Sequence, residues 1–245
     1  MCHGGGVHCQ EGSSPTIENC IFLENRALGH GAGVYCTASS PTFRDCKFIR
    51  NSATMAGEAS GGACSIWGKS SPVFLNCEFL ENEAKRGGGA IGFYGITKCR
   101  IENCIFSHNT ATDIGGGHIE CGSRAAPQIL DCTFHAGMGP EGSAFHCKDR
   151  AHPVFEKTII AYGELGMAIH CVDDGQATLR CCDLFANAGG DWVGTIEAQH
   201  CTDGNVSADP HFADPANGDF HLHPDSPLLK LEGCGAIGAD GRLGE

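Results

Sequence analysis

Acidic, basic and imidazole side chains recur at matching distances from three cysteines in the second half of the chain. Aligned on these cysteines, the segments are Cys121-Gly122-Ser123-Arg124, Cys147-Lys148-Asp149-Arg150 and Cys171-Val172-Asp173-Asp174. Carboxylates brought side by side repel each other and gain most by sharing a cation, for which Ca²⁺ is the oxygen-preferring choice. The spacing therefore predicts a Ca²⁺ site at Asp149, Asp173 and Asp174, provided that the fold stacks these segments.

The residue before each of these cysteines is also ionisable, namely Glu120, His146 and His170. Two imidazoles that lie one repeat apart can both reach a single transition-metal ion. His146 and His170 are therefore candidate ligand-binding residues. The competing interpretation is that both are surface histidines of a strand, which is the more common situation.

A sequence repeat organises the chain around these residues. The pattern Pro-x-Ile/Phe-x-Asn/Asp-Cys-x-Phe-x-x-Asn-x-Ala first spans 15–27 and returns with a period of about 27 residues. Its cysteine marks the successive repeats at Cys20, Cys46, Cys77, Cys104, Cys132 and Cys182, with Thr158 in the corresponding place of the sixth repeat. A period of this length is typical of a solenoid or another repeat architecture.

The stretch before each mark alternates apolar and polar residues after a block of glycines. Alternation with period two predicts a short strand that has one face directed into a core. The residues expected to face inward are Val7, Cys9, Ile119, Cys121, Phe145, Cys147, Ile169 and Cys171. Those expected to face outward are His8, Glu120, His146 and His170.

These features together predict an all-β fold, a parallel β-helix of about seven coils. The glycines exclude a helical solenoid, a leucine ladder is absent, and propeller blades need about 40 residues each. In a parallel β-helix, equivalent residues of successive coils stack at the strand spacing of about 4.8 Å. We assign residues 1–194 to the coils and 195–245, where the repeat stops, to a C-terminal cap over the open end.

Each column of the repeat has an expected role in this fold. The Asn25 column is predicted to form a tight bend in left-handed backbone with its amides stacked along the axis, and the Asn19 column a second bend. Ile17, Cys20 and Phe22 and their counterparts are predicted to face inward. Most of the 17 cysteines are then expected to be free thiols that stack on one another in the core. A few disulfides between them are the alternative, which the sequence does not decide.

The repeat resembles those of right-handed parallel β-helix proteins, which share the pectin-lyase-like fold, and also polymorphic outer-membrane protein repeats. The tail Asp209-Pro210-His211-Phe212-Ala213-Asp214-Pro215 and its continuation to Pro227 resemble the segment that ends many bacterial secreted β-helix proteins. The resemblance implies a single-stranded right-handed β-helix at an extracellular or cell-surface location. The proteins that share this fold include lyases, hydrolases, epimerases and adhesins, so the resemblance does not indicate which reaction, if any, the protein catalyses.

The charge and the distribution of apolar residues indicate which partners the chain does not suit. The formal net charge is −13 with only 16 Lys plus Arg, and no basic stripe is present, which argues against nucleic acid. No apolar run approaches the roughly 20 residues of a transmembrane segment. The acidity suits solubility or cation binding.

Lyases of the resembled fold use Ca²⁺ to acidify a uronate C5 proton and a Lys or Arg as base. The resemblance implies Lys148, Arg124 or Arg150 as base beside the three aspartates. A glycoside hydrolase would instead use paired carboxylates, for which Asp149, Asp173 and Glu120 are candidates. The plainer alternative is a solvated turn with weak Arg–Asp pairs.

The leading hypothesis is a secreted or cell-surface β-helix scaffold without catalysis of its own, binding polysaccharide or a cell-surface glycan. Its rival is the pectate-lyase-like enzyme or glycoside hydrolase acting on acidic polysaccharide, with Ca²⁺ as its cofactor. The aromatic residues that offer a platform for sugar are Trp67, Phe93, Tyr94, Tyr162 and Trp192.

Overall fold

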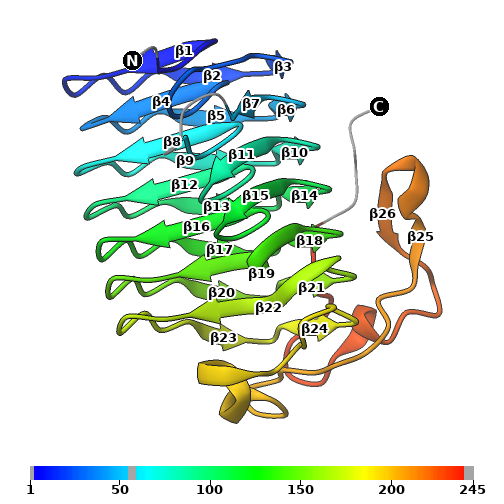
Figure 1. The fold of residues 1–245 in the computed structure, drawn as a ribbon. Coiled ribbons are helices and arrows are strands. Elements are labelled where there is room, and N and C mark those ends of the chain that lie inside the picture. The colour runs from blue at the N-terminus through cyan, green and yellow to red at the C-terminus, as the bar shows by residue number, and fades with distance from the viewer. Residues whose placement is uncertain (1–2, 55–58, 240–245) are drawn as a thin grey trace.

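The computed structural model describes residues 3–54 and 59–239, which form a stack of β-coils followed by a tail (Figure 1). Three parallel sheets form the walls of the stack, and successive coils are neighbours in each sheet. Residues pair in register from coil to coil: Ile91 of β12, for example, lies between Cys64 of β8 and Ile119 of β16. The predicted parallel β-helix is confirmed.

The first sheet contains ten strands in two runs that meet at a long strand, β19 (Met138–Cys147). One run is β1 (Val7–Cys9), β4 (Val34–Thr37), β8 (Cys64–Trp67), β12 (Ile91–Tyr94) and β16 (Ile119–Gly122). The other is β7 (Ser52–Ala53), β11 (Glu83–Arg86) and β15 (Thr110–Ile114), and β22 (Leu165–Cys171) pairs with β19.

The second and third sheets each contain seven short strands. The second is β2 (Thr16–Glu18), β5 (Thr42–Arg44), β9 (Val73–Leu75), β13 (Arg100–Glu102), β17 (Gln128–Leu130), β20 (Val154–Glu156) and β23 (Thr178–Arg180). The third is β3 (Ile21–Leu23), β6 (Lys47–Ile49), β10 (Glu78–Leu80), β14 (Ile105–Ser107), β18 (Thr133–His135), β21 (Ile159–Ala161) and β24 (Asp183–Phe185).

Columns of like residues fill the core. Phenylalanine rings of the third sheet stack with centroids 4.5–4.7 Å apart, in the order Phe22, Phe48, Phe79, Phe106 and Phe134. The cysteines at the repeat mark are buried as predicted, with one exception. Cys20 is exposed because, among the described residues, its coil is stacked against a neighbouring coil on one side only.

The asparagine column forms the predicted amide ladder but not the predicted bend. Each Nδ2 group donates to Oδ1 of the next asparagine at 2.8–2.9 Å, from Asn25 through Asn51 and Asn82 to Asn109. The left-handed residue is instead the one before each asparagine, such as Glu24 (φ 53°). The Asn82 side chain, for example, points into the coil and makes four hydrogen bonds. These bonds hold the asparagine in place without a left-handed backbone conformation. The Asn19 column does adopt the left-handed conformation (φ 53° at Asn19).

The end of the coil stack and the tail are joined by packing and by a disulfide. Trp192 and Ile196, the latter in η1 (Gly194–Gln199), are buried against the end of the core. Beyond them the tail contains β25 (Phe212–Asp214), η2 (Pro215–Asn217), β26 (Asp219–Leu222) and η3 (Pro227–Lys230). The β25–β26 hairpin stands beside the stack, where Phe220 packs against Ile105 of the third sheet (Figure 1). The tail therefore covers a side wall as well as the end.

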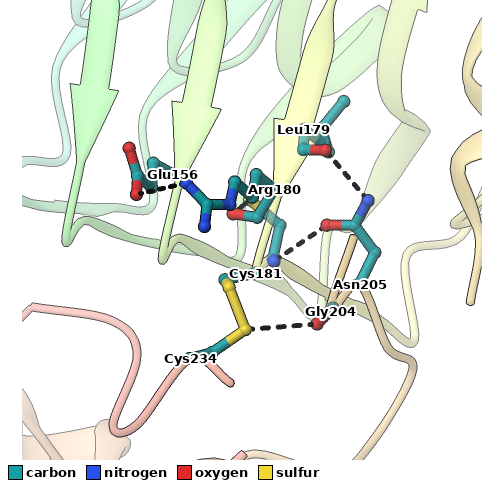
Figure 2. Close-up of a disulfide and its surroundings, with 8 residues drawn as sticks. Glu156, Leu179, Arg180, Cys181, Gly204, Asn205 and Cys234 are labelled. Atoms are coloured by element: carbon teal, nitrogen blue, oxygen red, sulfur yellow. Dashed lines mark hydrogen bonds and ion pairs between the residues drawn. A yellow bond between two sulfur atoms is a disulfide. The ribbon is translucent and has the colours of Figure 1, made fainter. Parts of the chain in front are cut away.

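Figure 2 shows the disulfide between Cys181 and Cys234, whose Cα atoms are 5.7 Å apart. Cys181 directly follows β23, and Cys234 lies in the tail after η3. Beside the bond, the Asn205 side chain accepts a hydrogen bond from the Cys182 amide and donates to the Leu179 carbonyl. The bond thus ties the tail to the last complete coil, and the other described cysteines are free thiols.

Removing one amide from the ladder should destabilise the whole stack. In Asn82→Ala, the Phe48 carbonyl and the Asn51 amides lose their buried partners. We expect the free energy of unfolding in urea to fall by at least about 2 kcal/mol. The exposed Asn217→Ala serves as the control, and equal values for the two variants would contradict a structural role for the ladder.

Removing the disulfide should loosen the tail. Because the bond closes a loop with a sequence separation of 53, Cys234→Ser should cost about 2–4 kcal/mol. Thermal unfolding with and without a reductant measures the effect: reductant should lower the midpoint of the native chain but leave that of the variant unchanged. Cys201→Ser, at an exposed free thiol, should behave like the native chain.

Candidate functional site

The turn after the first-sheet strands carries the predicted aspartates at equivalent positions in successive coils. Six turn residues have positive φ between 49° and 67°, namely Ser123, Arg124, Asp149, Arg150, Asp173 and Asp174. The main chain is bonded from coil to coil, as from Arg124 N to Asp149 O at 3.0 Å and from Arg150 N to Asp173 O at 3.1 Å. The alignment that stacked these segments is confirmed, and aspartate also suits this turn because it tolerates left-handed backbone.

These six side chains and Ile96 line an open surface groove of about 750 Å³. Arg150 Nε lies 3.6 Å from Asp174 Oδ2, and the two side chains are 62% and 78% exposed. An exposed pair of this kind contributes little to stability. Ca²⁺ binding by Asp149, Asp173 and Asp174 and a base role for Arg124 or Arg150 stay predictions.

A second cluster lies beneath the outer surface of the first sheet and gathers Glu120, His146 and Lys148. Glu120 Oε2 accepts a hydrogen bond from His146 Nδ1 at 3.2 Å, and Lys148 Nζ lies 3.0 Å from Glu120 Oε1. The Tyr94 hydroxyl donates to the same Oε1 at 3.1 Å. Three polar side chains, from β12, from β19 and from the residue after β19, therefore meet at the carboxylate of Glu120 in β16.

The expectation that this column lies at the surface is wrong for two of its members. Glu120 and His146 point away from the core, as predicted, but each is only 2% exposed. The segment before the alternating part of β19 covers them, since Glu141 Oε2 lies 3.0 Å from His146 Nδ1. Gly115 also packs so closely that a Cβ there would collide with Glu120. His170, in β22, is partly exposed, and His8 is exposed.

Hydrogen bonds and charge decide the state of the buried carboxylate. Burial alone would raise the pKa of Glu120, but the hydrogen bond from His146 and the positive charge of Lys148 outweigh it and lower the pKa. Burial and the Glu120 charge raise the pKa of the Tyr94 hydroxyl well above its ordinary value. Glu120 is therefore an ionised acceptor and Tyr94 a neutral donor at neutral pH.

A row of rings leads along the same sheet toward this cluster. Trp67 and Tyr94 stack with centroids 4.7 Å apart, His30 lies 5.1 Å from Trp67, and Tyr35 stacks on His3 at 4.7 Å. Trp67, Tyr94, Glu120 and Lys148 contribute to the lining of a small pocket of about 130 Å³.

Of the five aromatic residues expected to offer a platform for sugar, Trp67 and Tyr94 lie in this row. Phe93 and Trp192 are buried in the core, and Tyr162 lies under the tail, where its hydroxyl donates to Asp209 at 2.7 Å.

Sequence reasoning missed Tyr35 and Glu141. Tyr35 occupies the outward position of β4, which the alternation Val34-Tyr35-Cys36 could have revealed. Glu141 stands in the stretch Met138-Gly139-Pro140-Glu141-Gly142, whose ends pair with the neighbouring coils, Met138 with Leu165 and Gly142 with Met167. The register shifts between these two pairs, so the repeat does not predict where the Glu141 side chain lies.

Asp183 of β24 is a third ionisable group of interest and is completely buried. Burial raises its pKa to about 8, with the charges of Asp191 and Asp209 acting in the same direction. Its Oδ1 accepts a hydrogen bond from the Ala208 amide at 2.8 Å. That bond joins the last strand of the third sheet to the tail, so we assign Asp183 a structural role.

A family profile described as right handed beta helix region matches residues 1–79 and 76–205. The chain belongs to the right-handed β-helix family. This assignment agrees with the sheets and accounts for the coils, while the tail after residue 205 lies outside the match. No curated protein sequence matches the chain. Among the described residues, no helix has the length and apolar character needed to cross a membrane.

The buried aspartate predicts a pH dependence of stability. The pKa of Asp183 in the folded chain is about 8, above the ordinary 3.8, so the folded chain keeps a proton that the unfolded chain releases in this window. The unfolding free energy should therefore fall as pH rises through the window. Asp183→Asn removes the effect and should raise the melting midpoint over the native chain more at about pH 8 than at about pH 5.

Each kcal/mol regained corresponds to about 2–4 °C in the midpoint. The exposed Asp225→Asn is the control. A difference between Asp183→Asn and the native chain that does not vary with pH would contradict the raised pKa.

Proposed function

We propose that the protein is a secreted or cell-surface scaffold that binds a glycan along the outer face of its first sheet. The observation that carries this proposal is the set of partly exposed rings at Tyr35, Trp67 and Tyr94, on three successive strands of that sheet. Trp67 and Tyr94 are paired in register, and Tyr35 is paired with Ser65, two residues before Trp67. A rigid sheet holds the paired rings of Trp67 and Tyr94 at the strand spacing of about 4.8 Å, and amphipathic rings bind surfaces that are part apolar and part polar. The pyranose rings of a glycan chain offer surfaces of this kind.

Polar groups at one end of the row support the same function. The pocket beside Trp67 and Tyr94 is also lined by Ser60, Glu120 and Lys148, which offer donors and acceptors to sugar hydroxyls. Polar groups of this kind fix the orientation of a ligand that apolar contacts hold in place. The net charge of −13 disfavours a polyanionic glycan, so we infer a neutral one.

The disulfide supports an extracellular location. Cys181–Cys234 joins two distant parts of the chain, and disulfides of this structural kind persist in oxidising compartments. The buried free thiols are compatible with the same setting, since burial raises the pKa of Cys64 and Cys99 and so disfavours the reactive thiolate.

The groove at Asp149, Asp173 and Asp174 favours the rival function, a pectate-lyase-like enzyme or glycoside hydrolase acting on acidic polysaccharide. Three carboxylates and two guanidinium groups line one open surface, which suits a Ca²⁺-bridged uronate. Lys148, the other candidate base, lies in an ion pair with Glu120 instead. Proton abstraction by Lys148 would require that pair to break.

Glycan binding is tested by calorimetry with neutral oligosaccharides selected on a glycan array. Trp67→Ala should weaken binding at least about tenfold, or about 1.4 kcal/mol, because it removes the central ring of the row. Lys69→Ala changes an exposed neighbour outside the row and should bind like the native chain. Equal loss in both variants, or no binding by the native chain, would contradict the proposal.

The rival predicts a different set of results. Uronate polymers with Ca²⁺ should then yield an unsaturated product that absorbs in the ultraviolet, and Asp173→Asn should abolish it. That outcome, together with unchanged binding in Trp67→Ala, would assign the function to the groove.

A further inference from the structure

Three side chains beside the buried cluster have polar atoms that make no hydrogen bond, although Glu141 Oε2 lies 3.0 Å from His146 Nδ1. His146 Nε2, His170 Nδ1 and Glu141 Oε2 are all buried, and none has a hydrogen-bond partner among the described residues. Buried polar groups are almost always satisfied, so each unpaired atom requires an explanation. Three of them in neighbouring side chains point to one shared partner.

The fold brings these residues together from two adjacent strands. His146 and His170 are paired across β19 and β22, and their rings stack with centroids 5.5 Å apart and planes 17° apart. Glu141 reaches them from the earlier part of β19. One ligand atom from each of the three residues lies within 4.8 Å of the others.

The residues around His146 prepare its ring for a ligand. Its Nδ1 donates to Glu120 Oε2 at 3.2 Å, and Lys148 and Tyr94 hold the other oxygen of that carboxylate. A carboxylate that accepts from one imidazole nitrogen fixes the ring and leaves the other nitrogen for a metal ion. Nε2 is that other nitrogen, and it is the one without a partner.

We propose that Glu141, His146 and His170 bind a divalent transition-metal ion of the zinc class, with Glu120 as a positioning residue. Two imidazoles and one carboxylate are a donor set that zinc takes in proteins, and three protein ligands leave a coordination position open. The set is too rich in nitrogen for Ca²⁺ or Mg²⁺. The Glu141 side chain is 28% exposed, which gives the ion a path from solvent, and its carboxylate turns away from the contact with His146 Nδ1 when it binds the ion.

This inference does not depend on glycan binding. Glu141 and His170 lie outside the row of rings, and the proposed metal contacts none of Tyr35, Trp67 and Tyr94. Loss of zinc binding and loss of glycan binding are therefore separate results, measured on different variants.

The test is a titration of the chelator-treated full chain with ZnCl₂ by calorimetry, with bound zinc counted by elemental analysis. The native chain should bind one ion, and His170→Ala and Glu141→Gln should each weaken binding at least about tenfold. Zinc should also raise the melting midpoint of the native chain more than that of either variant. Co²⁺ in place of zinc should give visible bands of a site with imidazole ligands.

Two controls separate this site from other histidines. His8→Ala changes the exposed histidine at the outward position of β1, in the same sheet, and should leave zinc affinity unchanged. A His221→Ala/His223→Ala variant removes imidazoles of the tail and should also leave it unchanged. No binding by the native chain, or loss in the tail variant with none in His170→Ala, would overturn the proposal. Circular dichroism of each variant confirms that the fold is retained.

Discussion

In-register hydrogen bonding between successive coils is the constraint on which the rest of the structure depends. Each strand of the second and third sheets pairs in parallel with its equivalents in the neighbouring coils, residue for residue. A residue type repeated in the sequence therefore becomes a continuous row in space. The rows of phenylalanine rings and of asparagine amides are direct products of this pairing.

The same constraint explains why the site lies where the repeat is broken. A strict repeat stacks residues of the same type in successive coils. This favours packing but brings few different functional groups together. The column Gly92, Glu120, His146 and His170 changes type at nearly every step, so it combines acid and imidazole within a few rungs. The stretch before Gly142, where the register shifts, then adds Glu141 from outside the column. The residues that depart from the repeat therefore supply the ionisable groups of this surface, and the regular coils hold them in place.

The tail shows a second use of irregular sequence. The amides and carbonyls of the last coil require partners, and Asn205 and Val206 supply some of them. The tail then turns back along the third sheet, where Phe220 and Leu228 bury apolar surface and Cys234 bonds to Cys181. Neighbouring coils thus stabilise each other throughout the stack, and the tail protects its last coil.

The sequence alone determined the fold class, the strand positions, the stacking of the turn aspartates and the inward columns, because each depends on periodicity that one coil shares with the next. It also brought Glu120, His146 and His170 into one column. Only the tertiary structure decided that Glu120 and His146 are buried, that Glu141 and Tyr94 reach them, and that Cys181 pairs with Cys234. Those outcomes depend on segments outside the repeat and on where side chains meet across the surface. Periodicity carries no information about either.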